Sequence, residues 1–337
     1  GWSLEEKVGQ LMMVGVDATA PKDSSTEAVD THHVGNIFIA GRTTAGSQAT
    51  QKVIASFTGK VGPGTTHNTP MLVATDQEGG QVQVLGGSGF SDIPSASEQA
   101  IMSTDDLTAS ARTWGQELAD VGVTMNLAPV ADLVDIPDPS SNAPIGRWGR
   151  EYGQSATTSQ DRAIAFARGM EAAGVIPTYK HFPGLGRVTA NTDTADGVTD
   201  SITTRSGDPA VSVFAEAITG GARVIMVSSA IYSAIDSSAP ATFSSVVVTD
   251  MLRGDLGFTG VVITDDVSAA VQVDAWTPAE RAVQAVKAGC DIVLASADAT
   301  MAADMAEALI AEAQADPAFA QRVDESATRV ISLKAGS

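Results

Sequence analysis

Short apolar segments typical of buried β-strands recur along the whole chain, and this repetition constrains the fold more than any other feature. Eight such segments stand at Leu11–Val16, Val34–Ala40, Met71–Thr75, Met125–Val130, Val175–Tyr179, Arg223–Ser228, Val261–Thr264 and Ile292–Ala295. Most gaps between them have the apolar spacing of helices, as at Leu107–Val121, Ser155–Ala173, Asp208–Thr219, Pro278–Ala288 and Met301–Ala315. Buried strands that alternate with helices predict an α/β fold with a parallel sheet.

The number of these units predicts a closed (β/α)8 barrel of the TIM type. The alternative is an open doubly wound sheet, but no G-x-G-x-x-G motif follows an early strand. A chain of 337 residues has an ordinary length for one such barrel, and no low-complexity segment or long linker interrupts it. We therefore predict that residues 1–337 form a single barrel domain.

Charge and composition argue against several kinds of partner. The formal net charge is −20, which repels phosphate backbones, so we expect no nucleic-acid partner. No apolar run reaches the roughly 18–20 residues of a membrane span.

The chain starts at Gly1 without an initiator Met and is poor in Lys, which favours a processed protein outside the cytoplasm, secreted or attached to the cell envelope. We expect a monomer in which the lone Cys290 is a buried packing residue.

Polar side chains gather where the predicted strands end. They lie in Thr75–Gly80, at Asp132, Arg147 and Arg150, in Lys180–Gly184, at Ser228, Ser229 and Tyr232, and in Thr264–Asp266. The carboxyl ends of barrel strands share one face, which is where barrel enzymes keep their active sites. Charged groups form strong hydrogen bonds to hydroxyl groups, and a pair of carboxyl groups suits glycoside hydrolysis. These residues predict a site for a carbohydrate.

Each of these residues also has a structural interpretation. Asp76 could complete a turn, His181 could be a core histidine, and we expect Asp266 to cap the local chain. The four histidines form no metal-ligand spacing such as H-x-H or H-E-x-x-H, and no G-x-S-x-G motif marks a serine hydrolase. We therefore expect no catalytic metal and no cofactor, and favour a site that works through carboxyl groups.

The motifs resemble those of glycoside hydrolase family 3, in particular the bacterial β-N-acetylglucosaminidases that act on peptidoglycan fragments. Lys180–Gly186 is similar to the family signature K-H-F-P-G-x-G, and Leu256–Asp266 is similar to the segment that carries the nucleophile. The resemblance runs from Leu4–Leu11 to the last helix and implies a barrel glycosidase that removes terminal β-linked N-acetylglucosamine without a cofactor.

The resemblance also implies roles for individual residues. Asp265 matches the nucleophile, whereas Asp76, Arg150, Lys180 and His181 match residues that bind the sugar. The chain departs from the subgroup on the loop after the fifth strand, where Asn191-Thr192-Asp193 stands in place of Asp-Ser-His. Leu185 replaces the usual His of P-G-H-G, and Gln81 replaces an Arg.

These departures leave the general acid/base to be assigned, and we predict Asp193. The expected mechanism is retaining, through a glycosyl-enzyme on Asp265, and the loop that bears Asp193 should fold over the sugar and be mobile. Two alternatives remain, a β-glucosidase of the same family and a glycan-binding protein that has lost turnover. Hydrolysis and phosphorolysis of the glycosidic bond also both remain open.

Overall fold

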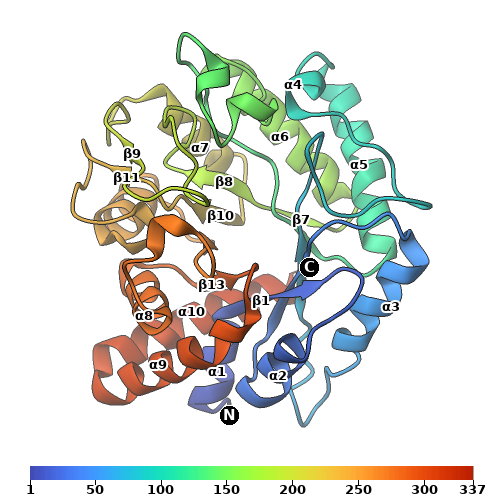
Figure 1. Ribbon diagram of the computed structural model, residues 1–337, viewed down its shortest axis with the longest axis vertical. Helices are drawn as coiled ribbons and strands as arrows, with labels where there is room; N and C mark the ends of the chain where they lie inside the picture. Colours follow the sequence, from blue (N-terminus) through green and yellow to red (C-terminus); the bar gives the residue numbers. More distant parts are fainter. Residues whose placement is uncertain (337) are drawn as a thin grey trace.

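The computed structural model describes residues 1–336, and in it parallel strands form a barrel ringed by helices (Figure 1). The barrel strands are β1 (Met12–Asp17), β2 (Asn36–Ala40), β3 (Leu72–Thr75), β6 (Met125–Asn126), β7 (Ile176–Pro177), β8 (Tyr179–Phe182), β10 (Val224–Val227), β12 (Val261–Asp266) and β13 (Ile292–Ala295). Their hydrogen-bonded order is β7-β6-β3-β2-β1-β13-β12-β10-β8. Only Thr178 separates β7 from β8, so the two ends of this order belong to one interrupted strand and the sheet closes. The predicted (β/α)8 barrel is confirmed.

The closure runs between the segment after β6 and the interrupted strand. Thr178 N donates to Ala128 O (2.9 Å), Lys180 N to Pro129 O (3.2 Å), and Ala131 N to Lys180 O (2.8 Å). The predicted fifth strand, which ended at Tyr179, was therefore too short, because Lys180 and the next two residues continue it. The predicted fourth strand was too long, since Pro129 has no N–H with which to extend a regular ladder.

Helices cover the outside of the barrel. They are α1 (Leu4–Gln10), α2 (Asp23–His32), α3 (Ser47–Thr58), α4 (Ala96–Gln99), α5 (Thr104–Asp120), α6 (Ala156–Ala172), α7 (Pro209–Thr219), α8 (Pro278–Ala288), α9 (Ala302–Ala315) and α10 (Pro317–Ala335), with a wider helix η4 (Val246–Asp255) before β12. Local sequence sets several starts. Ser3 and Thr277 each accept a hydrogen bond from the backbone three residues on, and a Glu there reaches back to the capping residue. Within residues 1–336, no helix combines the length and apolarity needed to cross a bilayer.

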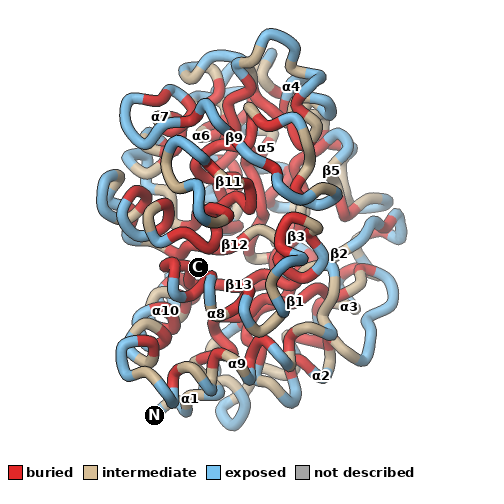
Figure 2. The backbone as a smooth tube through the Cα atoms, turned by 60° about the vertical axis from the view of Figure 1, so that its left-hand side comes forward, coloured by how far each residue is buried: buried red, intermediate tan, exposed pale blue. Residues whose placement is uncertain are grey.

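Alternate strand residues build two cores, one inside the barrel and one beneath the helices. Met13 points inward, whereas its neighbours Met12 and Val14 belong to the outer core. Figure 2 shows this burial concentrated on the strands and the inner sides of the helices. Val330 and Leu333 of α10 join the inner core, and the α10 terminus lies beside Arg223, which directly precedes β10. The helix α10 therefore closes the N-terminal end of the barrel, and the opposite end is left for a site.

The loops at that opposite end are long and have structure of their own. A hairpin of β4 (Gln77–Gly79) and β5 (Val82–Gln83) follows β3, and the short turns η1 (Pro139–Ser141) and η2 (Gly146–Trp148) follow β6. After β8, the chain forms β9 (Thr199–Asp200), which pairs with β11 (Ile231–Tyr232) of the next loop. The remaining short turns are η3 (Ala241–Phe243), η5 (Val271–Val273) and η6 (Ala299–Met301). Cys290 is fully buried, as predicted, and burial raises the pKa of its thiol to about 12.

Candidate active site

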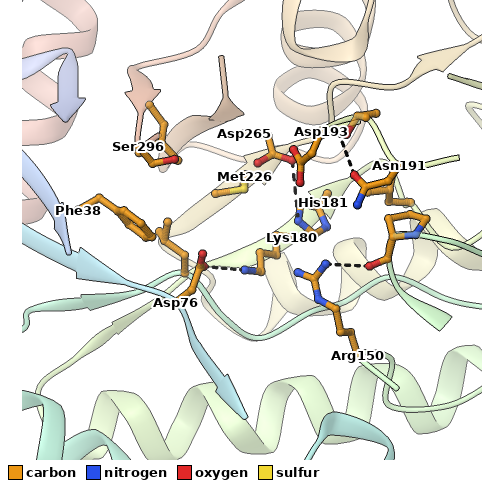
Figure 3. Close-up of a pocket in the computed structure, with 15 residues that line it drawn as sticks. Phe38, Asp76, Arg150, Lys180, His181, Asn191, Asp193, Met226, Asp265 and Ser296 are labelled. Carbon is orange, nitrogen blue, oxygen red and sulfur yellow. Dashed lines mark hydrogen bonds and ion pairs between the residues drawn. The ribbon is translucent and has the colours of Figure 1, made fainter. Parts of the chain in front are cut away.

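A pocket opens at the carboxyl ends of the barrel strands, and all six predicted site residues line it (Figure 3). These residues are Asp76, Arg150, Lys180, His181, Asp193 and Asp265. Its floor is the upper layer of the barrel interior, with Phe38, Leu127, Met226 and Leu294. The barrel therefore brings together side chains that lie up to 189 positions apart in the sequence, from Asp76 to Asp265.

One wall of the pocket is a network of charges centred on Glu78. Arg150 donates hydrogen bonds to both carboxyl oxygens of Glu78, from Nη2 (2.6 Å) and Nε (2.9 Å). Lys180 Nζ lies 2.7 Å from Glu78 Oε1. Burial alone would raise the pKa of Glu78, but the charges of Arg150 and Lys180 outweigh it and lower the pKa to about 2. Lys180 Nζ also lies 3.0 Å from Asp76 Oδ1. These contacts fix two cationic groups at the pocket wall with little side-chain freedom left.

A second polar chain runs from the core to Asp265. Buried Asp132 accepts hydrogen bonds from His181 N (2.9 Å) and Leu185 N (2.8 Å), and its other oxygen lies 2.7 Å from His181 Nδ1. The far nitrogen of the imidazole, Nε2, lies 4.0 Å from Asp265 Oδ2. His181 is thus held in one orientation, with one nitrogen turned towards the pocket.

The adjacent aspartates at the end of β12 have different surroundings. Asp265 lines the pocket, and its Oδ1 accepts only from Asp266 N (2.8 Å) among the contacts in residues 1–336. Asp266 accepts from the chain around it, including Ser268 Oγ (2.6 Å), Ala269 N (3.0 Å) and Ser296 N (2.9 Å). The expectation that Asp266 caps the local chain agrees with these contacts. Asp265 is the member of the pair left available to a ligand.

Asp193 reaches the same pocket from the loop after β8, beside Asp265 (Figure 3). The residue as a whole is exposed to solvent, and its carboxyl group lies in the pocket lining. The partial burial of this group there, and then the negative charges of Asp265 and Asp266, raise the pKa of Asp193 to about 6. Burial also raises the pKa of Asp265, against the opposing effect of His181. Two carboxyl groups that both resist ionisation therefore share one pocket.

The loop that carries Asp193 is tied down on both sides. Gln272 N donates to Thr192 O (3.0 Å), and the Gln272 side chain pairs with both backbone groups of Val198 (2.9 Å each). On the other side, Asn142 Nδ2 donates to Leu185 O (2.9 Å) and Val188 O (2.8 Å). These contacts hold the loop beside the pocket; that it covers a bound sugar and that it is mobile both stay predictions.

Sequence reasoning left Glu78 and Asp132 without a role, although both lie in segments that it had marked as strand ends. Both are buried carboxylates that contact predicted site residues, and their positions after strands three and four were the available signal. Other marked residues lie outside the pocket lining, among them Arg147, Ser228, Ser229 and Tyr232. Arg147 is exposed, and Tyr232 is buried with its hydroxyl donating to Gly184 O (2.7 Å). Within residues 1–336, no three His, Cys, Asp or Glu side chains are grouped to hold a metal ion.

Comparisons with known proteins agree with this fold and pocket. The model of the glycosyl hydrolase family 3 N-terminal domain matches residues 3–333. A solved β-N-acetylhexosaminidase from Beutenbergia cavernae is 53% identical, with a TM-score of 0.98 over 99% of both chains. A β-N-acetylglucosaminidase from Paenibacillus is 30% identical, with a TM-score of 0.85, and the match covers 99% of this chain and 62% of that one. The β-hexosaminidase LpqI of Mycobacterium tuberculosis is 31% identical over 304 residues, which are 87% of this chain and 73% of LpqI.

The chain therefore belongs to glycosyl hydrolase family 3 and is a glycosidase. The predicted family membership is confirmed.

Proposed function

We propose that this glycosidase removes terminal β-linked N-acetylglucosamine by a retaining mechanism in two steps. In the first step, Asp265 attacks the anomeric carbon while Asp193 gives its proton to the departing oxygen. In the second step, Asp193 takes a proton from water, and the oxygen of that water displaces Asp265 from the anomeric carbon. Each step inverts the anomeric carbon, so the released sugar keeps the β configuration.

The observation that carries this proposal is the contrast between the two carboxyl groups of the pocket. Asp265 stands at a rigid strand end with His181 and Lys180 as cationic neighbours, which oppose the effect of its burial. Asp193 stands on a loop, and its pKa of about 6 keeps a useful fraction of it protonated near neutral pH. A carboxyl group on a fixed strand beside Lys180 and His181 suits a nucleophile, and a loop carboxyl group with a raised pKa suits a general acid.

The charged wall supports the binding half of the proposal. Asp76, Arg150, Lys180 and His181 would hold the hydroxyl groups of the sugar in the −1 site through charge-assisted hydrogen bonds. Glu78 would not contact the sugar itself. It would hold Arg150 and Lys180 in position, because it occupies the buried side of both cations.

The substrate class follows from the relatives and remains a proposal for this chain. The Beutenbergia and Paenibacillus proteins are named for N-acetylhexosamine and N-acetylglucosamine, and we propose fragments of peptidoglycan as the source of the sugar. A location outside the cytoplasm is supported by a relative from Arthroderma benhamiae that is named a secreted glycosyl hydrolase. We further propose that the described barrel works as one domain and as a monomer.

Turnover of paired substrates tests the proposal. The chain should hydrolyse aryl β-N-acetylglucosaminide far faster than aryl β-glucoside, and a fluorinated N-acetylglucosamine inactivator should label Asp265. Preference for the glucoside would indicate a β-glucosidase, and sugar binding without turnover would indicate a glycan-binding protein. Labelling of Asp266 or Asp76 would refute the assignment of the nucleophile. A glycosyl phosphate formed in phosphate buffer would show phosphorolysis instead of hydrolysis.

A further inference from the structure

Asp132 is a buried carboxylate behind His181, on the side of the imidazole away from the pocket, and it takes no direct part in the proposed chemistry. It follows β6, has no exposed surface, and accepts three hydrogen bonds from the strand β8 region. An isolated carboxylate in such a position would be strongly unfavourable, so its partners must compensate for lost hydration. The role of Asp132 follows from which partners each of its two oxygens contacts.

The two carboxyl oxygens of Asp132 have separate tasks. Oδ1 accepts both backbone bonds, from His181 N (2.9 Å) and Leu185 N (2.8 Å), which fasten the chain around the end of β8. An uncharged amide oxygen could accept the same two bonds. Oδ2 is 2.7 Å from His181 Nδ1, and only this contact requires an acceptor in place of an amide NH2 group. The charge of Asp132 is therefore directed at the imidazole.

The second nitrogen of the His181 imidazole faces the proposed nucleophile, so the contact of Asp132 with His181 also bears on Asp265. When Nδ1 donates its proton to Asp132, the second nitrogen, Nε2, faces Asp265 Oδ2 at 4.0 Å. A lone pair on Nε2 would oppose an ionised Asp265, whereas an N–H there attracts it. An N–H at Nε2 is therefore the arrangement that suits the carboxylate it faces, and Asp132 is the acceptor that the opposite nitrogen, Nδ1, requires.

The other charged groups around Asp265 do not favour its ionised form as directly as His181 does. Asp266 and Asp193 are negative neighbours, which oppose the ionisation of Asp265. Lys180 is positive, but its ammonium group already contacts Asp76 (3.0 Å) and Glu78 (2.7 Å). His181 is the remaining neighbour, and its pocket-side nitrogen lies 4.0 Å from Asp265 Oδ2.

We propose that Asp132 is a positioning residue for the nucleophile, acting through His181 to keep Asp265 ionised while the proton of the carboxyl pair stays on Asp193. This inference rests on the proposed role of Asp265. It predicts that the charge of Asp132 sets the acidic limit of activity.

The test is the pH dependence of kcat/KM for a dinitrophenyl β-N-acetylglucosaminide, whose leaving group needs no acid. Asp132→Asn can keep the backbone bonds but presents an NH2 group to Nδ1. The acidic limb should move upward by about 1–3 pH units, the effect expected when a carboxyl group loses a cationic neighbour. Activity should therefore fall more at pH 5 than at pH 7.

Two further variants separate positioning from structure. His181→Gln should move the acidic limb in the same direction, and Asp132→Asn added to it should move the limb no further. The matched control is Asp200→Asn, because Asp200 is also buried and accepts from the backbone of Ile202 (2.7 Å) and Thr203 (2.8 Å). It does not line the pocket, so it should lower the melting temperature and leave the limb in place.

The outcomes are distinguishable. If the inactivator labels Asp265 and the limb stays in place in Asp132→Asn, the inference is wrong and the proposed function stands. If Asp265 is not labelled in the unmodified enzyme, the proposed function fails first. If Asp132→Asn does not fold, His181→Gln decides, because an unmoved limb in that variant overturns the inference as well.

Discussion

Asp193 offers the sharpest test, because its proposed role depends on a shifted pKa. An ordinary Asp has a pKa of 3.8, and burial, with the charges of Asp265 and Asp266, raises the pKa of this one to about 6. Near pH 7, that rise increases the protonated fraction roughly 100-fold, since each unit of pKa corresponds to a factor of ten. About a tenth of the enzyme would then carry the acid at pH 7, against less than a thousandth without the shift.

The perturbation is Asp193→Asn, assayed on substrates with different leaving groups. In the unmodified enzyme, kcat/KM for a disaccharide of N-acetylglucosamine should fall tenfold per pH unit above about pH 6. The variant should lose roughly 100- to 10,000-fold on the disaccharide, the usual contribution of a general acid. Its glycosylation step should lose far less with dinitrophenolate, which leaves unaided, and added azide should speed breakdown of the intermediate.

The control is Asp196→Asn, which removes a carboxyl group from an exposed position on the same loop. It should leave the alkaline limb and the disaccharide rate unchanged. An Asp193→Asn enzyme with the unmodified rate on the disaccharide would refute the assignment of Asp193 as the general acid. NMR titration provides a direct check. In Asp265→Asn, the pKa of Asp193 should fall because one negative neighbour is gone, but it should stay above 3.8 because burial is the larger cause.

Three further predictions concern the same site. Asp265→Ala should remove nearly all turnover and keep the fold, as judged by circular dichroism. Glu78→Gln should destabilise the protein by about 3–5 kcal/mol at pH 7, because it removes the buried negative charge that Arg150 and Lys180 contact. The pKa of Glu78 in the folded protein is lowered to about 2, so its contribution to the free energy of unfolding should be present above pH 4.5 and be lost towards pH 2. Denaturant titrations of Glu78→Gln and the unmodified protein measure this contribution, and a difference between them that does not change with pH would contradict the reasoning. Ionised Asp193 has the opposite effect on stability, since its raised pKa means that its ionisation is unfavourable in the folded protein. Asp193→Asn should therefore raise the melting temperature at pH 7, and the gain should vanish below about pH 4.

The sequence by itself was enough to predict the barrel. The alternation of apolar strand segments with amphipathic helices reflects local periodicity and burial, which every short window of the chain carries. The same rule placed the chemistry at strand ends, so Asp76, Lys180, His181 and Asp265 could be named before any distance was known. Motif resemblance then selected Arg150 over Arg147, since both stand in a long loop where periodicity has no signal.

Strand boundaries were predicted less well around the fifth strand. Val175–Tyr179 was predicted as the fifth strand, and Lys180 and His181 were placed just beyond its end. In the barrel they are strand residues, because the segment after β6 supplies backbone partners through Ala128, Pro129 and Ala131. Those partners lie about fifty positions away, and no local pattern reports them.

Only the tertiary structure decided how the charges of the site are shared. From sequence, Glu78 was one acidic residue among several, and Asp132 was a polar residue after a strand. Their roles depend on distances to Arg150, Lys180 and His181, which folding alone sets. The pKa of a carboxyl group likewise depends on burial and on charges a few ångströms away, which have no fixed separation in sequence. Amino-acid order thus determined which chemical groups this enzyme has and at which end of the barrel they stand, whereas the fold decided which of them hold a proton and which hold each other in place.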